Sequence, residues 1–194
     1  MKNILSSILL VGALGSGSAY AGDLHSEGLI SSGTSSVSET DLKHMRQCLF
    51  SDTQIAASRS IRACSKALKA SVPNYQIRSD LYARRGLLQL SAGRFDKASH
   101  DFESAARLND EHEFAYLGQG FSAMMQQQYV EAENFFSDCK GHKETAPLAS
   151  YGLAMTYELK GDTSRALQEY KNATALRPGW ESPRQEYARL SSRS

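Results

Sequence analysis

The fold is decided by the stretch PLASYGLAMTYELKGDTSRALQEYKNATALRP, which runs from Pro147 to Pro178. Apolar and small residues recur at helical spacing on both sides of Gly161-Asp162, and this pattern predicts two helices joined by a short turn. The two stripes consist of Leu153, Ala154 and Tyr157, and of Ala166, Tyr170 and Ala173. One such helical hairpin cannot bury its apolar face alone, so we expect neighbouring hairpins.

The same pattern occurs twice more at a period of 34 residues, so that units of 79–112, 113–146 and 147–180 align without a gap. Positions 8, 20 and 27 of the units hold small residues, and position 24 holds an aromatic residue. In order of position, these are Gly86, Gly120 and Ala154; Ala98, Ala132 and Ala166; Phe102, Phe136 and Tyr170; and Ala105, Cys139 and Ala173. Small residues let paired helices approach closely, and the ring fills the space beside them. Agreement at four positions in three units therefore predicts a repeat array.

The turn between the two helices follows the same register. Gly93 and Gly161 stand where the first helix must end, as suits a left-handed C-terminal cap. The middle unit has Gln127 at that place, and we expect either a tighter turn or a longer first helix there.

Weaker copies of the pattern flank the three units. In a degenerate unit at 41–78, Cys48 falls at position 8, and Ser60, Cys64 and Ala67 fall at positions 20, 24 and 27. Thr40 or Asp41 can cap its first helix, and about four extra residues lie around 72–78. After Pro178, we expect residues 181–194 to form a capping helix and a frayed tail, with Trp180 and Tyr187 packed on the last unit.

The N-terminal residues have the features of a signal peptide. Lys2 is the only charge before Asp23, residues 4–13 are apolar, and Ala19-Tyr20-Ala21 fits a cleavage site. We therefore expect a signal peptide at 1–21 and a flexible, Ser- and Gly-rich linker at 22–40. An uncleaved membrane anchor is the alternative, although the apolar run is short for a membrane span. Export to a bacterial periplasm is expected first, and secretion second.

The balance of charge argues against nucleic acid as a partner. The chain has 22 basic and 21 acidic residues, so removal of Lys2 with the signal peptide leaves a neutral mature protein. No basic patch is visible in the sequence, and a nucleic-acid-binding surface would need one.

The motif residues at positions 8, 20, 24 and 27 resemble the tetratricopeptide repeat family over about 41–190. The first unit is similar to the Cys-containing leading repeat of exported bacterial members. The resemblance implies an all-α, right-handed solenoid of helix-turn-helix repeats. It also implies a concave face, built by the first helix of each unit, that binds proteins or peptides.

The cysteines predict one disulfide and no metal site. Cys48 and Cys64 occupy two positions that face each other between paired helices, and export would place them in an oxidising compartment. We expect them to form a disulfide, and two buried thiols are the alternative. Cys139 is expected to be an inert core thiol, because Cys139 and His142 supply only half of a tetrahedral metal site. No motif predicts catalysis or a cofactor, so we expect neither.

The first helices supply a candidate partner-binding groove. Positions 2, 5, 9 and 12 should face the concave side, and their apolar members are Leu42, Met45, Leu49, Leu87, Leu90, Phe114, Leu117, Phe121, Met124, Leu148, Tyr151 and Met155. An exposed apolar surface of this kind suits an amphipathic helix or an apolar peptide. Phe121→Ala or Tyr151→Ala is then expected to abolish partner capture without unfolding the protein.

These observations predict a non-enzymatic, exported scaffold that binds a protein or peptide of the cell envelope. The alternative is a self-associating structural subunit of an envelope or secretion assembly, with homo-oligomers formed by the same chain. Occlusion of the groove by the linker or by a second copy also stays open, as does chance exposure of the apolar residues. An enzyme or a metal protein is the third hypothesis, for which the sequence offers no constellation of residues.

Overall fold

The computed structural model describes residues 37–50, 57–70 and 74–193. Within these ranges the chain forms helices and turns and contains no strand, so the predicted all-α fold class is confirmed. The chain divides into two compact units, residues 1–110 and 111–194. The signal peptide expected at 1–21 and most of the linker expected at 22–40 lie outside the described residues, and residues 39 and 40 already belong to the first described helix.

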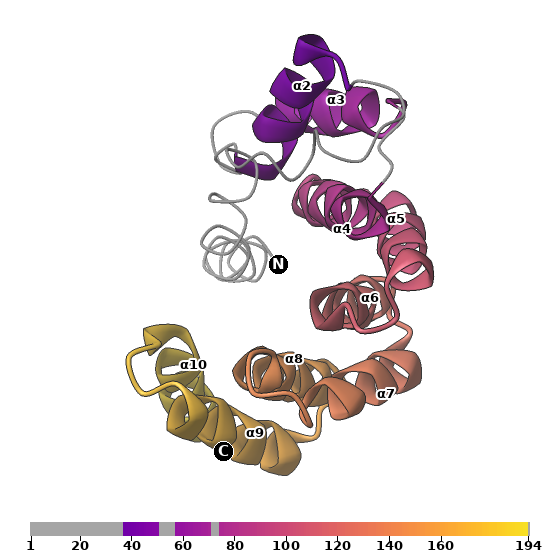
Figure 1. Cartoon of the computed structure of the whole chain (residues 1–194). Helices are drawn as coiled ribbons and strands as arrows, with labels where there is room; N and C mark the ends of the chain where they lie inside the picture. Colours follow the sequence, from indigo (N-terminus) through magenta and orange to yellow (C-terminus); the bar gives the residue numbers. More distant parts are fainter. Residues whose placement is uncertain (1–36, 51–56, 71–73, 194) are drawn as a thin grey trace. The chain divides into compact units, whose positions relative to one another are not determined.

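Unit 1 contains two helical hairpins, whose helices are labelled in Figure 1. The first pairs α2 (Glu39–Phe50) with α3 (Ala57–Ala67), and the second pairs α4 (Tyr75–Ser91) with α5 (Phe95–Leu108). Both α2 and α3 also pack against α4. The hairpins therefore share one interior.

Unit 2 continues the same scheme with two hairpins and one more helix (Figure 1). The hairpins are α6 (Glu113–Met125) with α7 (Tyr129–Cys139), and α8 (Ala146–Leu159) with α9 (Thr163–Leu176). Helix α8 packs against both α6 and α7, and α10 (Glu181–Ser191) packs against α9. Each unit is thus a stack of hairpins, as in an α-solenoid.

An aromatic ring against a glycine holds the hairpins together. A Cβ atom built on Gly86 would lie 3.0 Å from the ring of Phe102, and one built on Gly120 would lie 2.8 Å from the ring of Phe136. The Phe136 ring also reaches the next hairpin, where a Cβ atom on Gly152 would lie 2.5 Å from it. The small residues at position 8 are therefore required by the ring at position 24.

The first hairpin places a pair of cysteines where the others have glycine and phenylalanine. The Sγ atoms of Cys48 and Cys64 lie 2.07 Å apart, at disulfide distance, and both residues are fully buried. Because these cysteines occupy positions 8 and 24, a covalent link replaces the contact between the ring and the glycine.

The backbone conformation at Gln127 differs from the prediction. Gln127 has a φ of 64°, close to the 71° of Gly93 and the 80° of Gly161. Its N–H donates to the carbonyl of Met124 at 3.0 Å, and Gly93 and Gly161 make the equivalent bonds. The expectation of a tighter turn or a longer first helix is therefore wrong, because the backbone keeps the left-handed conformation without a glycine.

Two helix starts also differ from the prediction. Helix α4 begins at Tyr75 because the side chain of Asn74 accepts hydrogen bonds from the next turn, at 2.8 Å from the N–H of Gln76. The extra residues before Ser79 thus add one turn to α4. Helix α2 begins at Glu39, and Ser38 accepts from the N–H of Asp41, so Ser38 takes the capping role expected of Thr40 or Asp41.

Candidate protein-binding surfaces

Most residues of the predicted groove are buried. Eight of the twelve expose no more than 5% of their surface: Met45, Leu90, Leu117, Phe121, Met124, Leu148, Tyr151 and Met155. The expectation that they form an open apolar surface is therefore wrong for these eight residues.

The rings among these eight residues pack inside unit 2. Phe121 lies edge-on to Phe136, with ring centroids 4.9 Å apart. Tyr151 lies between Tyr170 and Trp180, at centroid distances of 5.7 and 4.8 Å. Trp180 thus packs on the last unit, as predicted. Phe121→Ala or Tyr151→Ala would remove core contacts, so neither substitution can separate binding from folding.

The physical reason for this burial is the composition of the first helices in unit 2. Every residue of α8 from Ala146 to Thr156 is buried, and α6 buries most of its residues as well. A helix that is apolar on all sides lies inside the protein, and no single face of it can be assigned to solvent from the sequence.

The other four groove residues keep part of their surface exposed. Leu42, Leu49 and Leu87 belong to unit 1, and Phe114 belongs to unit 2. Leu42 and Leu49 pack against the buried hydrophobic cluster that contains Cys48 and Cys64. Leu87 differs from its neighbour Leu88, which is fully buried, because adjacent helical residues point about 100° apart.

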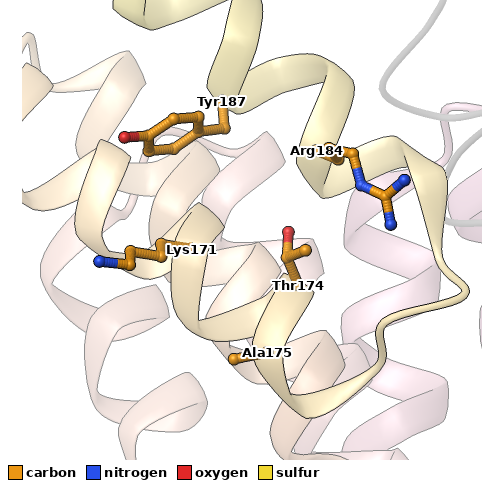
Figure 2. A pocket seen from close by; sticks show the side chains of 5 residues that line it. All are labelled: Lys171, Thr174, Ala175, Arg184 and Tyr187. Atoms are coloured by element: carbon orange, nitrogen blue, oxygen red, sulfur yellow. The ribbon is translucent and has the colours of Figure 1, made fainter.

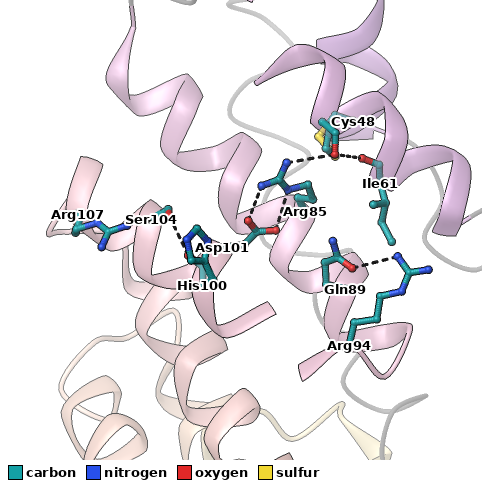
Figure 3. Close-up of polar contacts among 11 residues, drawn as sticks. Cys48, Ile61, Arg85, Gln89, Arg94, His100, Asp101, Ser104 and Arg107 are labelled. Atoms are coloured by element: carbon teal, nitrogen blue, oxygen red, sulfur yellow. Dashed lines mark hydrogen bonds and ion pairs between the residues drawn. A yellow bond between two sulfur atoms is a disulfide. The ribbon is translucent and has the colours of Figure 1, made fainter. Parts of the chain in front are cut away.

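A partly buried ion pair joins three helices of unit 1 (Figure 3). The guanidinium of Arg85 donates to both carboxylate oxygens of Asp101, at 2.8 and 2.7 Å, and to the hydroxyl of Ser65 at 3.2 Å. The Asp101 side chain is 3% exposed. Hydrogen bonding to Asp101 raises the pKa of Arg85, so the guanidinium stays charged. Arg85, at position 7 of its unit, therefore links Asp101 at position 23 of the same unit to Ser65 at position 25 of the preceding unit.

In unit 2 a polar cluster attaches α10 to the hairpin before it. Arg189 of α10 contacts Glu158 of α8 at 2.5 Å, and the hydroxyl of Tyr170 donates to the other oxygen of Glu158 at 3.0 Å. Burial, followed by the charge of Glu158, raises the pKa of Tyr170. Glu158 therefore fixes the position of α10.

The turn between α7 and α8 is fastened to the start of α6. Thr145 is fully buried, and its hydroxyl donates to the carbonyl oxygen of Cys139 at 2.9 Å. His142 Nδ1 lies 3.0 Å from a carboxylate oxygen of Glu113. Lys140, directly after α7, forms an ion pair with Glu169 of α9 at 2.8 Å. These contacts connect the turn between α7 and α8 with α6 and α9.

A groove of about 330 Å³ lies between α9 and α10. Lys171, Thr174 and Ala175 line it from α9, and Arg184 and Tyr187 line it from α10 (Figure 2). Tyr187, which was predicted to pack on the last unit, faces α9 across this groove and is 39% exposed. The sequence analysis did not single out this groove.

The described residues contain no cluster of three or more side chains suited to a metal ion. Burial raises the pKa of the Cys139 thiol to about 12, which keeps it protonated at neutral pH. None of the helices in the described ranges is both long enough and apolar enough to span a membrane.

The fold and these contacts define the class of protein, an array of helical hairpins repeated in one register. The tetratricopeptide repeat family model matches residues 79–112 and 149–179. These two segments of the chain are therefore tetratricopeptide repeats. A comparison with curated proteins gave no match.

Solved structures of MamA have the same fold. MamA from residue 41 to its end, from Desulfovibrio magneticus RS-1, is 14% identical with a TM-score of 0.63, covering 81% of this chain and 87% of that one. Two other crystal structures of MamA are 20% and 18% identical, with TM-scores of 0.57 and 0.59. They cover 70% and 79% of this chain, and 77% and 87% of theirs. At these identities the likeness concerns the fold alone.

The polar contacts were missed from the sequence, although a signal for two of them was present. Asp101 and Glu169 both stand at position 23 of their units. Each binds a cation that belongs to another helix, Arg85 in one case and Lys140 in the other. Comparing the charged residues of the units, and not only their apolar residues, would have shown that position 23 is acidic in two of them.

Proposed function

We propose that the protein is a non-enzymatic scaffold that binds another protein or a peptide through the exposed sides of its first helices. The observation that carries the proposal is the partial exposure of Leu87 on α4, a helix held on both sides by α5 and by the first hairpin. An apolar side chain on a rigid support costs little conformational entropy when it is covered by a partner. Leu42 and Leu49 are likewise partly exposed in unit 1, and Phe114 is partly exposed in unit 2.

We also propose that the protein works after export, in the periplasm first and outside the cell second. The link between Cys48 and Cys64 supports an oxidising compartment, since disulfides persist there and are rare in the cytosol. The measurement is the mass of the mature protein recovered from the periplasm of its host. Cleavage after Ala21 with both cysteines oxidised supports export, and an intact N-terminus with two thiols contradicts it.

Substitution of Leu87 by a charged residue tests the proposed binding surface. Leu87→Asp should remove the partner that co-purifies with the wild-type protein, and it should leave the helical circular dichroism unchanged. Lys97→Asp is the matched control, because Lys97 is exposed on the second helix α5 and should tolerate the same side chain without loss of the partner. Equal recovery of the partner with both variants would contradict the proposed surface.

A further inference from the structure

The second helices turn the same four positions of the repeat toward solvent. These are positions 19, 22, 26 and 29, whose separations of three and four residues place them on one side of a helix. In the second helices and the turns directly after them, every residue at these positions is at least partly exposed except Ser104, which is buried. These positions therefore describe the outer side of each hairpin.

In the first hairpin all four outer positions are basic. Arg59, Arg62 and Lys66 stand on α3, and Lys69 lies in the turn directly after it. All four residues are exposed, and α3 contains no acidic residue. Within the part of the chain that the structure describes, no ion pair engages any of them. Four charges of one sign thus face solvent along one helix.

The second hairpin of unit 1 continues this basic side. Lys97 at position 19 of α5 is exposed, whereas Arg107 at position 29 is paired with Glu103 at 3.0 Å. Helices α3 and α5 (Figure 1) lie side by side, because Arg85 contacts both Ser65 of α3 and Asp101 of α5. We call the five cations of this side the basic face: Arg59, Arg62, Lys66, Lys69 and Lys97.

The second helices of unit 2 have no such face. Their residues at the same four positions are Glu131, Asn134, Asp138 and Gly141 in and after α7, and Arg165, Gln168, Asn172 and Ala175 in α9. The basic face is therefore a property of unit 1 and does not follow from the repeat itself. The balanced total charge of the chain hid it from the sequence analysis.

The basic face is extended and does not converge on one point. The cations of the first hairpin follow one side of the helix over ten residues, a length of about 15 Å. A small anion is bound by groups that converge on it, whereas a bilayer with anionic lipids offers negative charge over a wide area. The spacing of the cations therefore fits a charged surface better than a small ligand.

The composition of the face favours a lipid surface over a protein. Protein interfaces have an apolar or aromatic centre, and charged residues are depleted there. No aromatic or large apolar residue occurs at the four outer positions of the first two hairpins. Attraction by Lys and Arg without an apolar anchor is typical of polybasic segments at anionic membranes. Nucleic acid would also attract such a face, and the choice of a bilayer rests on the proposed export.

We propose that the basic face of unit 1 binds the surface of a membrane that contains anionic phospholipids. The five cations pair with the phosphate groups of the lipids, and unit 1 stays outside the bilayer. The face belongs to second helices, whereas Leu87 belongs to the first helix α4, so the two surfaces use different residues and either can fail without the other.

Sedimentation with lipid vesicles tests the proposal. The protein is the mature chain, residues 22–194, so that the apolar run at 4–13 cannot itself bind the vesicles. We expect the protein to sediment with phosphatidylcholine vesicles that contain about 30% phosphatidylglycerol, and to stay in solution with pure phosphatidylcholine. About 1 M salt should release it, because the Debye length then falls to about 3 Å.

Two double variants locate the lipid-binding residues. Arg59→Glu with Arg62→Glu should weaken binding about twentyfold or more, because each cation near an anionic surface contributes about a factor of five. Both residues are exposed in the first half of α3, where acidic side chains suit the helix dipole, so we expect a folded protein, which circular dichroism checks. The matched control is Lys143→Glu with Lys171→Glu, which changes the net charge equally at two exposed residues of unit 2 and should leave the affinity unchanged.

The outcomes decide the occupant of the face. Loss of vesicle binding in the α3 variant and not in the control supports the proposal. No binding to the anionic vesicles, equal binding to pure phosphatidylcholine, or equal loss in both double variants overturns it. Binding to duplex DNA but not to vesicles would assign the face to nucleic acid and would also count against export. Leu87→Asp should leave vesicle binding unchanged, so failure of the proposed protein-binding surface is seen in a different variant.

Discussion

Removal of the link between Cys48 and Cys64 should loosen the first hairpin and leave unit 2 unchanged. The cysteines are 16 residues apart, and closing a loop of that length in the unfolded chain is worth about 3 kcal/mol. Because about 1.4 kcal/mol corresponds to a factor of ten, local opening of α2 and α3 should become about a hundredfold more frequent in the double variant Cys48→Ala, Cys64→Ala.

Native-state amide hydrogen exchange measures this opening helix by helix. Peptides from α2 and α3 should lose protection, and peptides from α8 and α9 serve as the reference within the same molecule. The matched control is Cys48→Gly, Cys64→Phe, which places in the first hairpin the pair that Gly86 and Phe102 form in the second. This control should regain part of the protection. Protection of α2 and α3 within about threefold of the parent in the alanine variant would contradict a stabilising role of the disulfide, as would equal loss of protection in α8 and α9.

Three further predictions follow from single residues. Gln127→Gly should raise the thermal midpoint by about 2 °C, because a left-handed backbone costs a non-glycine residue about 1 kcal/mol; an unchanged midpoint contradicts this. Asp101→Ala should cost about 3 kcal/mol in urea denaturation, since it leaves the charge of Arg85 partly buried and unpaired, and Arg85→Met in the same chain should recover part of the loss. Cys139, with its pKa near 12, should react with iodoacetamide at pH 8.5 about a thousandfold more slowly in the native than in the unfolded protein. The folded state holds this proton more tightly, so the contribution of Cys139 to stability should fall as the pH rises above about 9, and equal rates would contradict its burial.

The repeat register could be predicted because it depends on side-chain volume. Gly120 accommodates the Phe136 ring only because it has no Cβ atom, and this requirement leaves a mark at a fixed spacing in the sequence. The pairing of Cys48 with Cys64 followed from the same register. The match to the tetratricopeptide repeat model followed as well, because the matched segment at 79–112 is one of the units defined by that spacing.

The exposure of the first helices could not be predicted in the same way. Leu87 and Leu90 received the same assignment from the sequence, yet Leu90 is 1% exposed while Leu87 keeps part of its surface open. Which side of an all-apolar helix is covered depends on helices far away in the sequence. The conformation at Gln127 was missed for a related reason, since the packing of both helices over-rides the preference of one residue.

We propose that the exposed apolar side chains of the first helices contact another protein. A photo-crosslinking amino acid placed at Leu87 in the living host tests it most directly, with the same amino acid at Lys97 as the control. We expect one defined adduct from the Leu87 position, absent from the Lys97 position and mapped by mass spectrometry to a single segment of the partner. No adduct from Leu87, or the same adducts from both positions, would contradict it.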